Sequence, residues 1–213
     1  MSPPFSEYEK RVRDHALLAS TAFLIIIPLG VLVPRYLRTF TNKWWRLHAL
    51  LNLLIAAPLV YAAWGMAASA RNISHAPIAH HQRVGYAILS LYTAQVLLGP
   101  FIHFIRIPFL PIAHRPLQNY FHAVLGLTIL AMAGYQIHYG LYTEWELMTG
   151  NVHPVKQSLK HAWLALLIVS SASEPAVSHD QFVLLDILVP VCDRVGALAS
   201  PVQTGARSQG GAR

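Results

Sequence analysis

Four long stretches without any charged residue constrain this chain more than any other feature. Each lacks Asp, Glu, Lys and Arg, and together they occupy positions 15–34, 47–70, 84–105 and 116–143. A helix of about 20 residues, rising about 1.5 Å per residue, crosses a hydrocarbon core of about 30 Å. The sequence therefore predicts an all-α integral membrane bundle, with transmembrane helices at roughly 15–37, 46–70, 81–105 and 117–142.

The remaining composition supports a membrane location and argues against nucleic acid as a partner. Hydrophobic residues make up 54% of the 213-residue chain and charged residues 12%, and the mean hydropathy is positive. The net charge of +7 comes from basic residues in short loops and in the tail, where they anchor a membrane protein at its interfaces. We expect contact with membrane lipid, no nucleic-acid binding, and a location in the plasma membrane or an endomembrane.

Cysteine content and the N-terminal sequence limit covalent chemistry and targeting. Cys192 is the only cysteine, so the chain forms no intrachain disulfide and cannot attach haem through a CxxCH motif. The N-terminal residues "MSPPFSEYEKRVRDH" lack the apolar core and cleavage site of a signal peptide. We therefore expect the first helix itself to serve as the insertion signal.

The chain changes character after residue 160. An apolar run at 161–169 and a second at 182–191 are each too short to cross a bilayer. The final residues "ASPVQTGARSQGGAR" are small and polar, which is typical of disorder. We recognise no internal repeat. The expected organisation is an N-terminal extension (1–9), a transmembrane domain with an incomplete fifth segment (10–169) and a disordered C-terminal tail (170–213).

Four of the twelve histidines share a common position. Each lies in the first turn or two of a different predicted helix: His15, His48, His81 and His122. Ionisable side chains inside membrane spans are costly and tend to mark functional sites. The other eight histidines lie at helix ends or in loops, where we interpret them as solvated or interfacial side chains.

The topology of a four-helix bundle sorts these four histidines into two pairs. Successive helices run in opposite directions, so His15 and His81 share one membrane face, and His48 and His122 share the other. A six-coordinate haem iron takes one axial ligand on each side of its plane, which matches a pair. A zinc site needs three or four ligands, often including Cys or a carboxylate, and the sequence offers no such additional ligand at these depths.

Two glycines add to the pattern. Gly85 follows His81 by four residues, and Gly126 follows His122 by four, so each glycine lies on the same helical face as its histidine. A missing side chain there would make room for a large flat ring. The alternative is the ordinary packing of small residues between membrane helices.

The segments "HALLASTAFLIIIPLGVLVPRY", "WWRLHALLNLL", "HHQRVGYAILSLYTAQVLLG" and "RPLQNYFHAVLGLTIL" together resemble the cytochrome b561 family. The likeness is to the fungal-type domains that often follow an extracellular DOMON module. The resemblance implies a helical bundle that holds two haem b groups without covalent attachment. It implies axial iron ligands paired as His15 with His81 and His48 with His122, and electron transport from one membrane face to the other.

The resemblance also guides choices that spacing alone leaves open. His80 and His81 are adjacent, and the family's HQxxG context favours His81 as the ligand. His103 is a competitor for the other face, but it lies about 33 Å along the helix from His81, at or beyond the interface, so we prefer His48. Lys43 and Arg46 are weaker candidates for binding an anionic reductant, with headgroup anchoring as the alternative.

Partners and competing functions complete the expectations. The resemblance implies a cytosolic reductant such as ascorbate and an acceptor on the opposite face, so the chain would be at most an ascorbate-dependent or ferric reductase-type oxidoreductase. Because no DOMON module is seen, an extracellular haem protein would be a separate chain, and a homodimer is left open. The alternatives are a small transporter or scaffold without haem, or a non-haem metal membrane oxidase. The last would need clustered histidine boxes, and "HAPIAHH" lacks their spacing.

Overall fold

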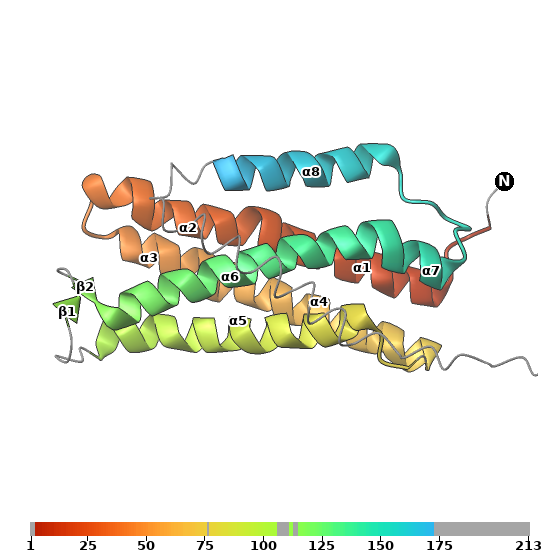
Figure 1. The fold of residues 1–213 in the computed structure, drawn as a ribbon, viewed down its shortest axis with the longest axis horizontal. Coiled ribbons are helices and arrows are strands. Elements are labelled where there is room, and N and C mark those ends of the chain that lie inside the picture. Colours follow the sequence, from red (N-terminus) through yellow and green to blue (C-terminus); the bar gives the residue numbers. More distant parts are fainter. Residues whose placement is uncertain (1–2, 76, 106–110, 113–114, 173–213) are drawn as a thin grey trace, which may run out of the picture. The chain divides into compact units, whose positions relative to one another are not determined.

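The fold is an all-α membrane bundle. A computed structural model describes residues 3–75, 77–105, 111–112 and 115–172. Four helical spans among them are long and apolar enough to cross a membrane: Glu7–Thr39, Trp44–Ser74, His80–Phe104 and Gln118–Thr149. Figure 1 shows these spans running along one common axis. The prediction of an integral membrane bundle with four spanning helices is confirmed.

The first span contains a π-helical segment next to a proline. It consists of α1 (Glu7–Thr21), the π-helical η1 (Ala22–Ile26), α2 (Ile27–Tyr36) and the short 3₁₀ segment η2 (Leu37–Thr39). Pro28 has no N–H for the carbonyl of Leu24, and its ring crowds that carbonyl. Leu24 lies inside η1, so the wider π turn accommodates the proline without ending the helix.

The second span repeats this arrangement. It consists of α3 (Trp44–Ala49), the π-helical η3 (Leu50–Ala56) and α4 (Ala57–Ser74). Pro58 stands two residues beyond η3, and the carbonyl that it crowds, that of Leu54, lies within η3. The span ends at His75, whose positive φ of 49° reverses the chain.

The third and fourth spans form an antiparallel pair. Helix α5 (His80–Phe104) is followed by the two-residue strands β1 (Pro111–Ile112) and β2 (Arg115–Pro116), which pair antiparallel. The fourth span then comprises α6 (Leu117–Tyr139), the π-helical η4 (Gly140–Glu144) and α7 (Trp145–Thr149). Gly150, with a φ of 60°, ends α7.

A further helix, α8 (Gln157–Ala172), has 16 residues and is not among the candidate spans of the described chain. This agrees with the expected incomplete fifth segment, although α8 begins four residues before the apolar run at 161–169. The apolar run at 182–191 and nearly all of the predicted disordered tail lie outside the described residues. The predicted tail therefore stays a prediction.

The core joins the two helix pairs. Helix α1 packs along α4, and α5 packs along α6. The buried core consists mainly of small and aliphatic residues with two aromatic rings: Ala22, Phe23, Ile27, Ala56, Ala57, Val60, Ile88, Tyr92, Ile129 and Ala133. Phe23 and Tyr92 meet edge to face, with ring centroids 5.8 Å apart.

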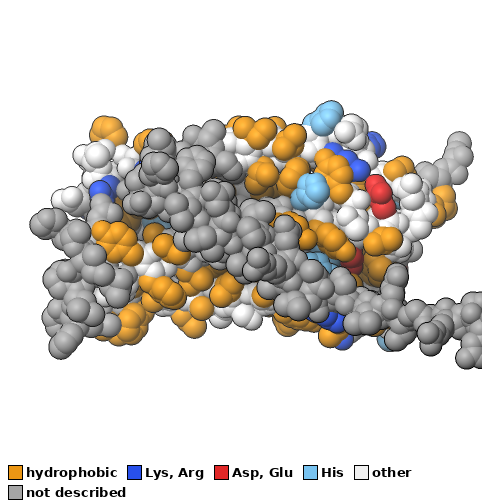
Figure 2. Space-filling view, viewed as in Figure 1, with side chains coloured by type: hydrophobic (Ala, Val, Ile, Leu, Met, Phe, Trp, Pro, Cys, Tyr) orange, Lys and Arg blue, Asp and Glu red, His pale blue; other side chains and the backbone are white. Residues whose placement is uncertain are grey.

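The outer surface suits lipid. Large apolar side chains are widely exposed along the spans, including Leu54 (69% exposed), Leu97 (68%) and Phe104 (78%). Figure 2 shows hydrophobic side chains over the visible part of the bundle, with few charged ones among them. An apolar surface of this extent is stable only when a bilayer covers it.

Candidate functional site

The structure brings His15 of α1 and His81 of α5 together. Their ring centroids are 6.2 Å apart, and the ring planes meet at 82°. The Nδ1–H of His15 donates to the backbone carbonyl of Ala63 on α4 at 2.8 Å. Because a carbonyl only accepts, this hydrogen bond fixes the tautomer and leaves the lone pair of His15 on Nε2.

His48 of α3 and His122 of α6 form a second pair with nearly the same geometry. Their ring centroids are 6.3 Å apart, and the ring planes meet at 71°. The Nδ1–H of His48 donates to the carbonyl of Gly30 at 2.7 Å, so its lone pair also lies on Nε2. Pro34 has no N–H to give to the Gly30 carbonyl, which leaves that oxygen free for His48.

Both ring separations match two imidazoles that share one metal ion. A metal–nitrogen bond is about 2.0–2.1 Å, and the nitrogen lies about 1.2 Å from the ring centre, so two ligands on opposite sides of one metal ion have ring centroids about 6.4–6.6 Å apart. Among the described residues, no three His, Cys, Asp or Glu side chains gather in a way that could hold a metal ion. A site with only two protein ligands suits haem, since the porphyrin supplies the four equatorial nitrogens.

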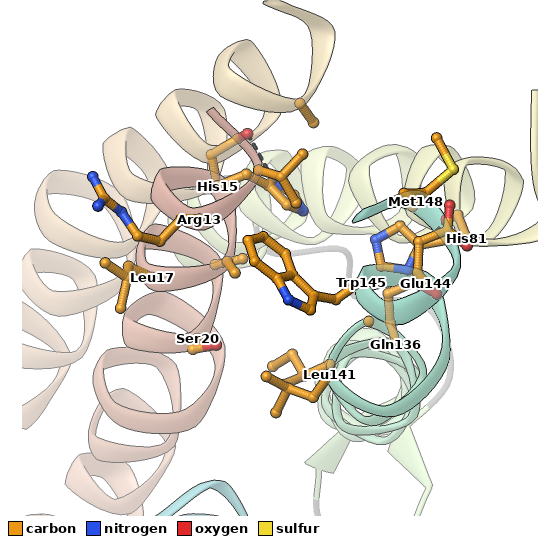
Figure 3. A pocket seen from close by; sticks show the side chains of 18 of the residues that line it. Arg13, His15, Leu17, Ser20, His81, Gln136, Leu141, Glu144, Trp145 and Met148 are labelled. Carbon is orange, nitrogen blue, oxygen red and sulfur yellow. Dashed lines mark hydrogen bonds between the residues drawn. The ribbon is translucent and has the colours of Figure 1, made fainter. Parts of the chain in front are cut away.

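A cavity lies beside the first pair. Its volume is about 490 Å³, and it is lined largely by apolar side chains together with His15, His81, Gln136 and Glu144. Figure 3 shows the two histidines on either side of this pocket, with Trp145 between them in the view. Cavities of this size and character are typical of cofactor sites. The residues present therefore fit a haem at this end of the bundle.

Competing histidines lie elsewhere. The ring of His80 lies against Tyr139, with centroids 5.5 Å apart, while its neighbour His81 faces His15. The exposed His103 stacks on Trp45 at 4.2 Å. The structure thus gives each of these two histidines an aromatic partner, and neither belongs to the two histidine pairs.

The predicted glycines meet glutamine side chains of the opposite helix. A Cβ at Gly85 would lie 3.6 Å from Nε2 of Gln136, and a Cβ at Gly126 would lie 2.9 Å from Nε2 of Gln95. These glutamines donate to the backbone carbonyls of His81 and His122. That the glycines make room for a porphyrin stays a prediction.

The residues that make these contacts belong to a sequence repeat shared by α5 and α6. Helices α5 and α6 both carry the pattern H-x3-G-x9-Q-x3-G, which runs from His81 to Gly99 in α5 and from His122 to Gly140 in α6. A Cβ at Gly99 would meet His122 at 3.6 Å, and one at Gly140 would meet His81 at 3.3 Å. The expectation of no internal repeat is therefore wrong, and identical spacing in two successive helices was the signal.

Lys43 and Arg46 lie at the start of the second span, on the side of His48. Both are exposed. Lys43 precedes α3 directly, and the Arg46 guanidinium lies over the Trp45 ring at 5.5 Å. Nothing in this geometry separates anion binding from headgroup anchoring, so a reductant contact at these residues stays a prediction.

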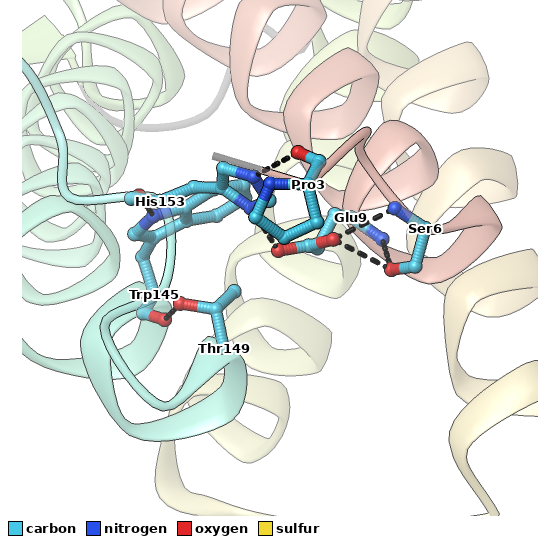
Figure 4. Close-up of polar contacts among 6 residues, drawn as sticks. All are labelled: Pro3, Ser6, Glu9, Trp145, Thr149 and His153. Carbon is cyan, nitrogen blue, oxygen red and sulfur yellow. Dashed lines mark hydrogen bonds and ion pairs between the residues drawn. The ribbon is translucent and has the colours of Figure 1, made fainter. Parts of the chain in front are cut away.

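A polar cluster at the end of the bundle that carries His15 and His81 includes a histidine that we expected to be solvated. His153, only 10% exposed, forms an ion pair with Glu9 at 2.7 Å, and its Nε2 lies 2.8 Å from the Pro3 carbonyl (Figure 4). Trp145 donates to the His153 carbonyl at 2.6 Å. The hydrogen bond to Glu9, and then that to Pro3, raise the pKa of His153 above its usual value. Sequence could not foresee this pairing across 144 positions.

The comparisons with known proteins agree with this architecture. The family model of eukaryotic cytochrome b561 matches residues 14–147, which is more than half of the chain. The protein therefore belongs to the cytochrome b561 family, whose members are haem b membrane proteins.

A similar curated protein is a cytochrome b561 and DOMON domain-containing protein of Arabidopsis thaliana, which is 27% identical over 161 residues. The match covers 73% of this chain, and the chain spans only about a third (36%) of that relative's length. No solved structure matches the chain.

Proposed function

We propose that this chain transports single electrons across a membrane by means of two non-covalently bound haem b groups. His15 and His81 would hold one haem, and His48 and His122 would hold the other. The observation that carries the proposal is the pair of imidazole–imidazole separations, 6.2 and 6.3 Å, each suited to one metal ion. Family membership supports the same function.

The spacing of the two sites supports a relay across the bilayer. Eighteen residues of α5, or about 27 Å of helical rise, separate His81 from Gly99, the glycine that faces His122. The hydrocarbon core of a bilayer is about 30 Å thick. Each histidine pair therefore lies near one membrane face.

The chain's own residues bind and orient the cofactors and exclude water between them. When bound, haem supplies a one-electron iron couple at each site. Carbonyl groups of Ala63 and Gly30 hold the rings of His15 and His48 in the tautomer that presents Nε2. Phe23, Tyr92 and Ile129 lie between the two sites along their helices and are at most 8% exposed.

The electron donor is proposed to be an ascorbate-like anion at the face that carries Lys43 and Arg46, since exposed cations near a redox site attract an anionic reductant. The acceptor, a ferric chelate, a semidehydro radical or a separate extracellular haem protein, acts at the His15–His81 face. On this proposal, the Lys43→Ala/Arg46→Ala double variant raises the ascorbate concentration needed for half-maximal haem reduction. It leaves haem content unchanged.

The proposal is tested by haem content and its assignment to ligands. Pyridine haemochrome quantitation of purified protein is expected to give two haems per chain. His15→Ala and His81→Ala should remove one spectral component, and His48→Ala and His122→Ala the other. His80→Ala and His103→Ala are matched controls that should keep both. A purified protein without haem would contradict the proposal and favour a scaffold or transporter.

A further inference from the structure

We propose that Gln95 and Gln136 are positioning residues for the haem-binding histidines, each acting on the histidine of the opposite helix. Gln95 on α5 fixes His122 on α6, and Gln136 on α6 fixes His81 on α5. This inference rests on the proposed function and adds two residues to its machinery. Neither glutamine is a ligand of the iron in this assignment.

The contacts are reciprocal. The Nε2–H of Gln95 donates to the His122 carbonyl at 2.8 Å, and the Nε2–H of Gln136 donates to the His81 carbonyl. Nε2 of Gln95 also lies 3.4 Å from Nε2 of His122. Each glutamine follows the histidine of its own helix by 14 residues, so an antiparallel pair places both contacts at equivalent levels.

Glycine at the fourth position after each histidine makes these contacts accessible. In an α-helix the side chain at i+4 lies over the carbonyl of residue i, which already accepts one backbone N–H. Gly85 and Gly126 have no side chain to cover the carbonyls of His81 and His122. The second lone pair of each carbonyl is thus open to a donor from a neighbouring helix.

The other two ligands are fixed by a different contact. His15 and His48 are held through ring Nδ1–H groups, which donate to backbone carbonyls. In contrast, Nδ1 of His81 and Nδ1 of His122 are buried with no hydrogen-bond partner among the described residues. For these two histidines, the glutamine contact to the backbone takes the place of the missing ring contact.

Both glutamines would destabilise the fold if they served only to fill space, because their polar amide groups are buried. Gln136 is only 9% exposed, and Oε1 of each glutamine is buried without a hydrogen-bond partner within the described chain. A leucine would fill the same space without leaving a buried amide oxygen unpaired. The presence of an amide at both positions is therefore explained by its N–H groups, which donate to the histidine carbonyls.

The expected effect on redox potential has a defined sign. The positive end of the Gln95 amide points toward the candidate iron ligand and disfavours the more positive ferric state. Removing it should lower the midpoint potential of the His48–His122 haem. Gln95→Leu is expected to change that reduction equilibrium by about tenfold, which is about 59 mV for one electron.

The test is redox titration of the purified holoprotein, with both midpoint potentials and the low-spin optical bands recorded. Gln95→Leu should shift the His48–His122 haem and leave the other unchanged, although Gln95 shares a helix with His81. Gln136→Leu should do the reverse. Gln118→Leu, four residues from His122 on the same helix, is the matched control and should shift neither. Gln95→Met and Gln136→Met serve where a leucine variant does not fold.

Gly126→Ala gives an independent test of the same contact. Its Cβ would stand 2.9 Å from the Gln95 amide and displace it, so the variant should reproduce the Gln95→Leu shift and add nothing in that background. A Cβ at Gly85 would make only an ordinary 3.6 Å contact with Nε2 of Gln136, so this displacement test is made at Gly126. Loss of haem from Gly126→Ala whatever residue stands at 95 would overturn this inference and assign Gly126 to the porphyrin pocket.

The outcomes for the proposed function and for this inference are distinct. Two haems in the wild type, with potentials that no glutamine variant moves, would overturn the inference and leave the proposed function standing. A wild type without haem would overturn both.

Discussion

At the scale of single residues, the site depends on side chains that donate hydrogen bonds to backbone carbonyl oxygens. Pro34 lacks the N–H that would otherwise donate to the Gly30 carbonyl, and His48 donates to that oxygen instead. Asn52 donates to the carbonyl of His48, four residues before it, at 2.8 Å. Three of the four candidate ligands, all but His15, thus receive a side-chain amide at the backbone carbonyl. Precise ligand placement depends on such supporting contacts.

Gly30→Ala should damage the His48–His122 site. A Cβ at Gly30 would clash with Nδ2 of Asn52, so the asparagine and the histidine that it holds must move. Overpacking of this kind costs about 1–3 kcal/mol. The variant should lose the low-spin spectrum of that haem in part or whole, measured by reduced-minus-oxidised difference spectra.

Gly65→Ala is the matched control for that variant. Apart from its chain neighbours and the backbone of its own helix, no described atom lies within 4 Å of a Cβ at Gly65, so this change should keep both haems. Equal haem content in the two variants would show that the close contact between Gly30 and Asn52 has no bearing on the site.

Ring orientation leads to a spectroscopic prediction. The ring planes of the two pairs meet at 82° and 71°. Perpendicular axial imidazoles donate π density to different iron d orbitals, which keeps these orbitals close in energy and makes the ferric low-spin signal strongly anisotropic. Electron paramagnetic resonance of oxidised protein should therefore give such signals for both haems. Rhombic spectra, typical of parallel rings, would contradict the ring geometry.

At the scale of elements, the charge-free stretches predicted the four spans but not their full length. The first span begins at Glu7, eight residues before the predicted start, because Ser6 and Glu9 form a capping box that starts the helix outside the apolar core. Absence of charge marks only the part of a helix that lies in hydrocarbon. The π-helical segments near Pro28 and Pro58 also went unpredicted, although an internal proline is the usual signal of such a distortion.

The stability contributed by the ion pair between Glu9 of α1 and His153, which follows α7, should depend on pH. Glu9 raises the pKa of His153 in the folded protein above its usual 6.5. Below that value the histidine is protonated in both folded and unfolded states, so the ion pair contributes in full. Its contribution is lost as the pH rises through the raised folded value.

Thermal unfolding in detergent micelles measures this effect. The melting temperature of the wild type should exceed that of His153→Ala by more at pH 6 than at pH 9. Glu9→Gln should remove most of the same pH-dependent difference, since it deletes the partner carboxylate. A difference that grows with pH would contradict the sign of the pKa change.

At the scale of the whole molecule, the two helical spans within each pair are related to each other by near-equivalent contacts. His15 donates to the carbonyl of Ala63, which lies 15 positions after His48. His48 donates to the carbonyl of Gly30, which lies 15 positions after His15. The H-x3-G-x9-Q-x3-G pattern relates α5 and α6 in the same way. The sequence contained the four histidines and this spacing. The pairing of Glu9 with His153 and the cavity shape depend on tertiary packing and were not foreseeable.

This arrangement predicts that electron flow across the membrane requires both histidine pairs. Proteoliposomes loaded with ascorbate, with an impermeant ferric chelate outside, should reduce the chelate faster than protein-free vesicles. His48→Ala and His81→Ala should each retain one haem yet lose the transmembrane rate. With one site missing, the remaining electron step spans most of a hydrocarbon core of about 30 Å, and tunnelling falls steeply with distance. A wild-type rate equal to that of empty vesicles, with both haems bound, would replace the relay by haem sensing or storage.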